Sequence, residues 1–224
     1  MTFNLSDKTK KMLAAIAAGI LGNLLSFLSS LLTPMQPQVS FDFSHLATFI
    51  TAIAFGPFYG MIAGAVGSIY PYMHYAVFGI YGPFFGLAII FGKAMTGFVC
   101  GLLRNKMPVF LAVNISYIPE SLFTFGFSQM MTMFLPAGML DAKIISGIII
   151  EGWVEVIIFS FLIDTVMRQK IIETAVLMLE IFIIMFLVHK EFINTLLILL
   201  LITLITMILF EIIKPFVRKH RGSE

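Results

Sequence analysis

The fold of this chain is decided by the segment from Ser40 to Gly86, which reads SFDFSHLATFITAIAFGPFYGMIAGAVGSIYPYMHYAVFGIYGPFFG. Long apolar runs flank the segment on both sides. The segment itself combines an aspartate, two histidines and many aromatic residues with closely spaced glycines. Glycines at helical spacing let the backbones of membrane helices approach one another closely. The segment therefore indicates tightly packed helices beside an unusual concentration of polar side chains.

Composition places the chain among integral membrane proteins. Of its 224 residues, 59% are hydrophobic and 12% are charged, whereas soluble domains average about 25% charged residues. Apolar runs of about 20 residues, the length that spans a bilayer as a helix, recur along the whole sequence. We therefore expect an all-α membrane protein of about eight spans. The predicted helices cover residues 12–32, 43–55, 58–78, 83–103, 108–135, 143–166, 170–188 and 192–213.

The distribution of basic residues predicts the orientation of these helices. With the N-terminus inside, only Lys143 and Lys190 fall on the outer side, and Lys93 falls within the membrane. This asymmetry follows the positive-inside rule and places both termini in the cytoplasm. Residues 1–11 are then a cytoplasmic N-terminal segment and residues 214–224 a basic cytoplasmic tail. The basic residues on the predicted cytoplasmic side are Lys8, Lys10, Lys11, Arg104, Lys106, Arg168, Lys170, Lys214, Arg218, Lys219 and Arg221.

Four ionisable residues are expected at membrane depth, where a charge is costly and a functional role is the first hypothesis. They are Lys93, Glu120, Glu151 and Glu155. Glu151 and Glu155 are one helical turn apart and share a face. One interpretation is structural, with Lys93 paired to Glu120 or Glu155. The other is a substrate-binding site that accepts a cation, a protonatable ring or hydrogen-bond donors.

Aromatic residues gather at the predicted outer end of the third and fourth helices. His74, Tyr75 and Tyr81 belong to this group, and Trp153 lies between the two glutamates of the sixth helix in sequence. Such residues are typical of the aromatic belt at a membrane interface. They also suit the wall and lid of a pocket for a flat ring. We therefore include these four among the candidate substrate-binding residues.

Small residues form a stripe along the first predicted helix. Ala14, Ala18 and Gly22 recur at intervals of four residues, and such stripes allow helices to pack closely in lipid. The stripe either contacts a neighbouring helix of the same chain or docks against another membrane protein. The same pattern around Gly60 and Gly97, in the middle of the chain, favours internal packing.

The sequence lacks the common motifs of enzymes. Residues 86–93 approach a phosphate-binding loop, but the gap is one residue too long and Ala94 replaces the required Ser or Thr. Hydrolase and metalloprotease motifs are absent as well. Asp42 and His45 begin the second predicted helix, yet no spacing of His, Cys and carboxylates indicates a metal site. We expect no enzymatic activity, no cofactor, no metal and no nucleic-acid partner.

Two segments carry a family pattern, and they read FDFSHLATFITAIAFGPFYGMIAGAVGSIY and YGPFFGLAIIFGKAMTGFVCGLLRNK. Asp42 enters the second helix, and a Phe-Gly-Pro turn follows at 55–57. A glycine-rich third helix comes next, and a second Gly-Pro at 82–83 opens a fourth helix that ends in the basic residues Arg104 and Lys106. With these features the chain resembles the substrate-binding S components of energy-coupling factor (ECF) transporters.

The resemblance covers about residues 10–168 and implies a six-helix substrate-binding bundle over residues 12–168 in a prokaryotic cell membrane. Such a bundle captures a water-soluble vitamin or related micronutrient from outside. A transmembrane T component and two ATPase subunits, all separate chains, drive its release inside. The family's pocket lies in the outer half, built by the loop between helices one and two and by helices four to six. Its partner-docking motif on helix one corresponds to Ala14 and Ala18.

Residues 169–213 depart from this family, because they predict two additional transmembrane helices. Two other functions therefore stay open. The chain is a structural membrane scaffold of cell-shape machinery, which needs no pocket, or a stand-alone carrier coupled to protons or cations. The carrier would act through the same four residues at membrane depth.

Overall fold

The computed structural model describes residues 6–32, 42–79, 82–134 and 142–167. Within these ranges the chain is helical and contains no strand. The elements are α1 (Asp7–Leu32), α2 (Ser44–Phe55), α3 (Pro57–Gly67), α4 (Ile69–Pro71), the π-helix η1 (Tyr72–Val77), α5 (Gly82–Leu103), α6 (Val109–Met131) and α7 (Ala142–Met167). By length and composition, α1, α5, α6 and α7 can each cross a membrane. The predicted all-helical class is therefore confirmed for the described residues, and four of their helices are long and apolar enough to span a membrane.

Most predicted helices match observed ones to within a few residues, and the clearest shift is at the start of α1. This helix begins at Asp7 rather than at residue 12. The reason is Ser6, whose Oγ accepts a hydrogen bond from the Thr9 N–H at 3.2 Å and so caps the helix. Lys11 Nζ lies 3.0 Å from Asp7 Oδ2, one turn further along. The two helices predicted after residue 169 lie outside the described residues.

One predicted helix, residues 58–78, is wrong, because the structure divides it into α3, α4 and η1. Pro71 contributes, since it has no N–H and its ring collides with the carbonyl four residues earlier in a regular helix. Asn23 of α1 occupies the break. Its Nδ2 donates to the Val66 carbonyl oxygen at 2.7 Å, and its Oδ1 accepts from the Tyr70 N–H at 2.6 Å. The amide thus inserts into a bond that a continuous helix would make between those two backbone groups.

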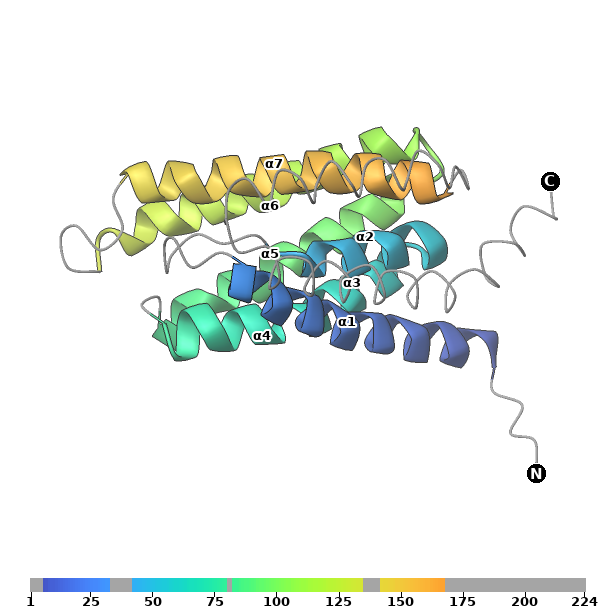
Figure 1. The fold of residues 1–224 in the computed structure, drawn as a ribbon, viewed down its shortest axis with the longest axis horizontal. Helices are drawn as coiled ribbons and strands as arrows, with labels where there is room; N and C mark the ends of the chain where they lie inside the picture. Colours follow the sequence, from blue (N-terminus) through green and yellow to red (C-terminus); the bar gives the residue numbers. More distant parts are fainter. Residues whose placement is uncertain (1–5, 33–41, 80–81, 135–141, 168–224) are drawn as a thin grey trace, which may run out of the picture.

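The helices form layers (Figure 1). Helices α6 and α7 run side by side along one side of the molecule, α1 and α4 lie on the opposite side, and α2, α3 and α5 lie between them. Gly56 connects α2 to α3 with a φ of 101°, a conformation that favours glycine. Through this turn α3 folds back along α2. All residues of α2 are buried, so its first turn lies in the interior of the molecule.

Close contact between α3 and α5 positions one of the charged residues. A Cβ on Gly60 would lie 2.5 Å from the carbonyl oxygen of Gly97, and a Cβ on Gly64 would lie 2.5 Å from the carbonyl oxygen of Lys93. Only glycine fits at so short a separation. The predicted internal packing of these glycines is confirmed, and it holds the backbone of Lys93 against the centre of the bundle.

The small residues of α1 also pack within the chain. Ala14, Ala18 and Gly22 are buried, and Ala18 is only 1% exposed. A Cβ on Gly22 would lie 3.4 Å from Cβ of Ala47 in α2. The structure therefore shows the first of the two interpretations, a contact with neighbouring helices of the same chain. The three residues are buried in this contact, and their predicted role in docking a partner stays a prediction. The exposed face of α1 instead carries large apolar side chains such as Ile20.

Candidate ligand-binding site

A partly open pocket of about 180 Å³ lies between the start of α2, the α4–η1 segment and helices α5, α6 and α7. Its lining mixes ionisable groups with aromatic and aliphatic ones, as is usual in small-molecule sites. The lining residues are Asp42, His45, Pro71, Tyr75, Gly86, Ala88, Ile89, Lys93, Tyr117, Glu120, Thr124, Phe127, Ser128, Met131, Ile148, Glu151, Gly152 and Glu155.

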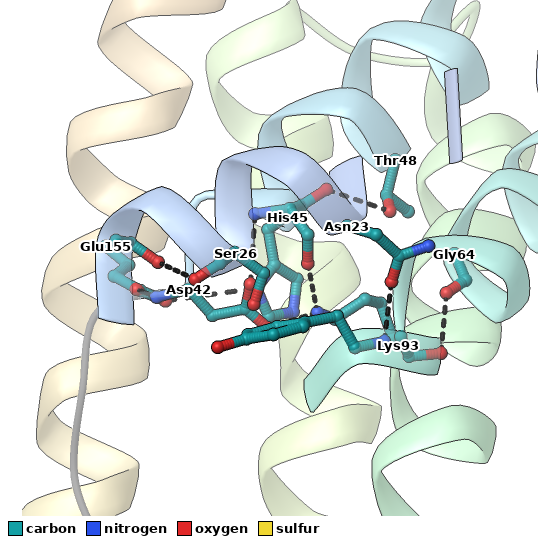
Figure 2. Close-up of polar contacts among 12 residues, drawn as sticks. Asn23, Ser26, Asp42, His45, Thr48, Gly64, Lys93 and Glu155 are labelled. Carbon is teal, nitrogen blue, oxygen red and sulfur yellow. Dashed lines mark hydrogen bonds and ion pairs between the residues drawn. The ribbon is translucent and has the colours of Figure 1, made fainter. Parts of the chain in front are cut away.

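Asp42, the residue that lies two positions before α2, anchors the polar part of this pocket. Its Oδ2 pairs with Lys93 Nζ, and the same ammonium donates to Ser44 Oγ. Figure 2 shows Asp42 between Lys93 and Glu155. Burial raises the pKa of Asp42, but the nearby Lys93 and His45 together with hydrogen bonds from Lys93 and Ser44 hold that pKa well below its usual value. Lys93 therefore has a charge partner already, and it differs from the predicted partners Glu120 and Glu155.

His45 forms a second polar group with Glu120. The ring Nε2 lies 3.3 Å from Glu120 Oε1 and 3.4 Å from Oε2, and Thr96 Oγ1 donates to Oε2 of the same carboxylate. A Cβ on Gly92 would lie 3.1 Å from Cγ of Glu120, so this glycine leaves room for the side chain. Both oxygens of Glu120 are thus engaged by groups of the protein itself.

Glu155 lies on the other side of His45. Its Oε1 accepts a hydrogen bond from the backbone N–H of Asp42, which fixes the start of α2 against α7. Its Oε2 lies 3.9 Å from His45 Nδ1, a separation too long for a hydrogen bond. The His45 ring is buried, and its Nδ1 has no hydrogen-bond partner among the described residues. One histidine nitrogen and one carboxylate oxygen are therefore left with hydrogen-bonding capacity beside the pocket.

Glu151 lies one turn before Glu155 on α7 and also lines the pocket. Its side chain is half-buried, and no described residue forms a hydrogen bond or ion pair with it. The next residue, Gly152, makes room for a pocket wall, because a Cβ there would overlap the hydroxyl of Tyr117. Tyr117 is 5% exposed and packs edge-on to the His45 ring, with ring centroids 6.0 Å apart.

The structure brings most of the predicted substrate-binding residues together. Those that line the pocket are Tyr75, Lys93, Glu120, Glu151 and Glu155. His74 instead is exposed and stacks on Tyr70, with centroids 5.5 Å apart. Trp153 packs against the hydrophobic core and edge-on to Tyr117, with centroids 5.3 Å apart. Tyr81 lies outside the described residues.

The sequence-based site missed Asp42, His45, Thr96 and Tyr117. A signal for Tyr117 existed, since it lies one turn before Glu120 and therefore shares its face of α6. Asp42 and His45 were noted only as residues at the start of the second predicted helix, which with the N-terminus inside would begin on the outer side. Because α2 begins inside the bundle, these two residues instead reach the middle of α5 and α7.

The polar lining is predominantly acidic, with four carboxyl groups facing one lysine and one histidine. Among the described residues, no three His, Cys, Asp or Glu side chains come together so as to hold a metal ion. No known protein family, curated protein or solved structure matches the chain. The site is therefore interpreted from its own geometry.

Proposed function

We propose that this chain is the membrane-embedded substrate-binding subunit of an ECF-type importer, which captures a water-soluble vitamin or related micronutrient. The observation that carries the proposal is the pocket. It opens between membrane-length helices and mixes buried ionisable groups with aromatic walls. A binding protein requires such a pocket, whereas a structural scaffold does not.

The position of the pocket supports the resemblance. In S components the pocket is built by the loop between helices one and two and by helices four to six. Here Asp42 lies between α1 and α2, and the largest share of the lining comes from α5, α6 and α7, which correspond to the fourth, fifth and sixth predicted helices. The proposal includes a T component and two ATPase subunits as partners. It places no partner on Ala14, Ala18 and Gly22, which are buried within the chain.

The proposal also includes the finer topology. The chain is multi-pass in a prokaryotic cell membrane, with eight spans and both termini cytoplasmic. In this arrangement residues 12–168 form the six-helix substrate-binding bundle and residues 169–213 add two helices to it. The support for this orientation is the distribution of basic residues.

A second candidate is a stand-alone carrier coupled to protons. The observation that favours it is the buried arrangement of His45 between Glu120 and Glu155. Chains of His and carboxylates inside a membrane bundle are typical of proton relays. In this candidate the same pocket releases its ligand without ATPase subunits.

Two measurements on the purified chain test the function. Mass spectrometry of small molecules released on denaturation should detect one enriched micronutrient, and affinity purification from the native membrane should recover ATPase subunits. Uptake of that molecule by the isolated chain in liposomes, driven by a proton gradient, would instead establish the carrier. A chain that releases no small molecule and recovers no ATPase would contradict the importer.

A further inference from the structure

We propose that the pocket selects a small organic cation: a primary ammonium or protonated nitrogen base attached to a single ring. Its N–H groups meet Glu151, Glu155 and His45 Nδ1. This inference rests on the proposed function and names the chemical class of its substrate.

The first argument is the distribution of charge in the pocket. Asp42 is neutralised by its ion pair with Lys93, and Glu120 is engaged by the donors of His45 and Thr96. Glu151 and the second oxygen of Glu155 have no such partner among the described residues, and both face the pocket from adjacent turns of α7. A bound cation would neutralise the acidic lining, whereas an anion would meet two carboxylates and no free positive charge from the lining residues.

The second argument is the protonation of His45. Carboxylate oxygens only accept hydrogen bonds, so the ring Nε2 near Glu120 must be the donor. In the neutral ring Nδ1 is then an acceptor. This nitrogen is buried without a partner in the part of the chain that the structure describes, and its side chain is 6% exposed and lines the pocket. A buried acceptor without a partner is destabilising, and an N–H donor on a ligand would satisfy it. The histidine therefore points independently to a ligand that donates hydrogen bonds.

The third argument is size and apolar lining. A cavity of about 150 Å³ accommodates a benzene molecule, so a pocket of about 180 Å³ holds one six-membered ring with a short substituent. The walls offered to that ring include Tyr75, Tyr117 and Phe127 as well as Ile89 and Ile148. An aromatic face next to a carboxylate is also a favourable environment for an organic cation.

The test uses three probes that share one ring and differ in charge: benzylammonium, benzyl alcohol and benzoate. Each is titrated into the purified full-length chain in detergent at constant ionic strength, and the thermal unfolding midpoint is recorded. Benzylammonium should raise the midpoint in a saturable manner, and the other two probes should raise it less or not at all. Equal or larger shifts with benzyl alcohol or benzoate, or no shift with benzylammonium, would overturn the proposed class.

Glu151→Gln tests the contact itself. This variant keeps the shape of the side chain, and no described residue forms a hydrogen bond or ion pair with Glu151, so folding should be preserved. Loss of a hydrogen bond to a charged group should weaken benzylammonium affinity about tenfold to a hundredfold. Asp164→Asn is the matched control, because Asp164 lies on the same helix outside the pocket lining, and its affinity should equal that of the wild type. Equal affinity of the Glu151→Gln variant would overturn the assignment of this residue.

The outcomes separate this inference from the function on which it rests. A neutral or anionic molecule released from a chain that copurifies with ATPases would overturn the cation and leave the importer in place. Selective binding of benzylammonium by a chain that recovers no ATPase would support the organic cation and contradict the importer.

Discussion

A glycine shapes one wall of the pocket. Gly152 of α7 lies directly against the Tyr117 hydroxyl, so Gly152→Ala must displace the tyrosine or the helix. Overpacking of this kind usually costs about 1–3 kcal/mol. We expect a lower thermal unfolding midpoint for the purified variant, by about 2–4 °C per kcal/mol for a chain of this size. We also expect weaker benzylammonium binding, because Tyr117 lines the pocket.

Gly126 of α6 provides the matched control, since no described atom outside its own stretch of helix lies within 4 Å of the position of its missing Cβ. Gly126→Ala should leave the midpoint unchanged or raise it, because alanine favours a helix by about 0.5–1 kcal/mol over glycine. An unchanged midpoint in both variants would show that Tyr117 can move aside without loss of stability, and would contradict the tight packing between Gly152 and Tyr117.

At this scale the sequence predicted which ionisable residues line the pocket better than it predicted which residues contact one another. The rule that an ionisable group at membrane depth is functional found Lys93, Glu120, Glu151 and Glu155, all of which line the pocket. It could not find that Lys93 pairs with Asp42, because that contact depends on where α2 begins in space. Trp153 was predicted to line the pocket together with its sequence neighbours Glu151 and Glu155, which do so. Its own ring packs against the hydrophobic core instead.

Among the elements, α1 shows how a small-residue stripe is used. Ala18 is 1% exposed and faces the interior of the chain, so Ala18→Leu should separate α1 from α2 and α3. We expect a midpoint lowered by several degrees, in line with an overpacking cost of about 1–3 kcal/mol. Ligand binding should weaken with it, since α2 carries His45.

Ile20 is the control on the opposite face of the same helix, because it is 59% exposed. Ile20→Leu should unfold at the wild-type midpoint. If Ala18→Leu kept the wild-type midpoint and ligand binding but lost its ATPase partners, the result would support the interpretation of the stripe as a partner-docking surface.

Helix boundaries could be predicted where they depend on local sequence signals. The break after α3 could not, because it depends on a contact with a distant residue. Apolar length and the Gly-Pro pairs located α2 and α5 to within a few residues. The break between α3 and α4 depends on Asn23, which lies far away in sequence and inserts between Val66 and Tyr70. Pro71 was a local hint, but prolines are tolerated in membrane helices when neighbouring groups satisfy the freed backbone, as the uninterrupted α6 around Pro119 shows.

In the whole molecule, the ends that carry basic residues lie together. Figure 1 shows the start of α1, the connection between α5 and α6 and the end of α7 at the same end of the bundle. Lys8, Lys10 and Lys11 belong to the first of these sites and Arg104 and Lys106 to the second. One basic end is what the positive-inside rule expects of a cytoplasmic face.

This orientation is tested by introduced cysteines at the two ends of α6. Asn105 is exposed at the basic end, and Met133 is 81% exposed just past the other end. A membrane-impermeant thiol reagent should label Met133→Cys in intact cells, and it should label Asn105→Cys only after permeabilisation. The native Cys100 is fully buried, so the wild type serves as the unlabelled blank. The reverse pattern would show that the molecule has the opposite orientation in the membrane. Equal labelling of both sites in intact cells would mean that α6 does not span the membrane.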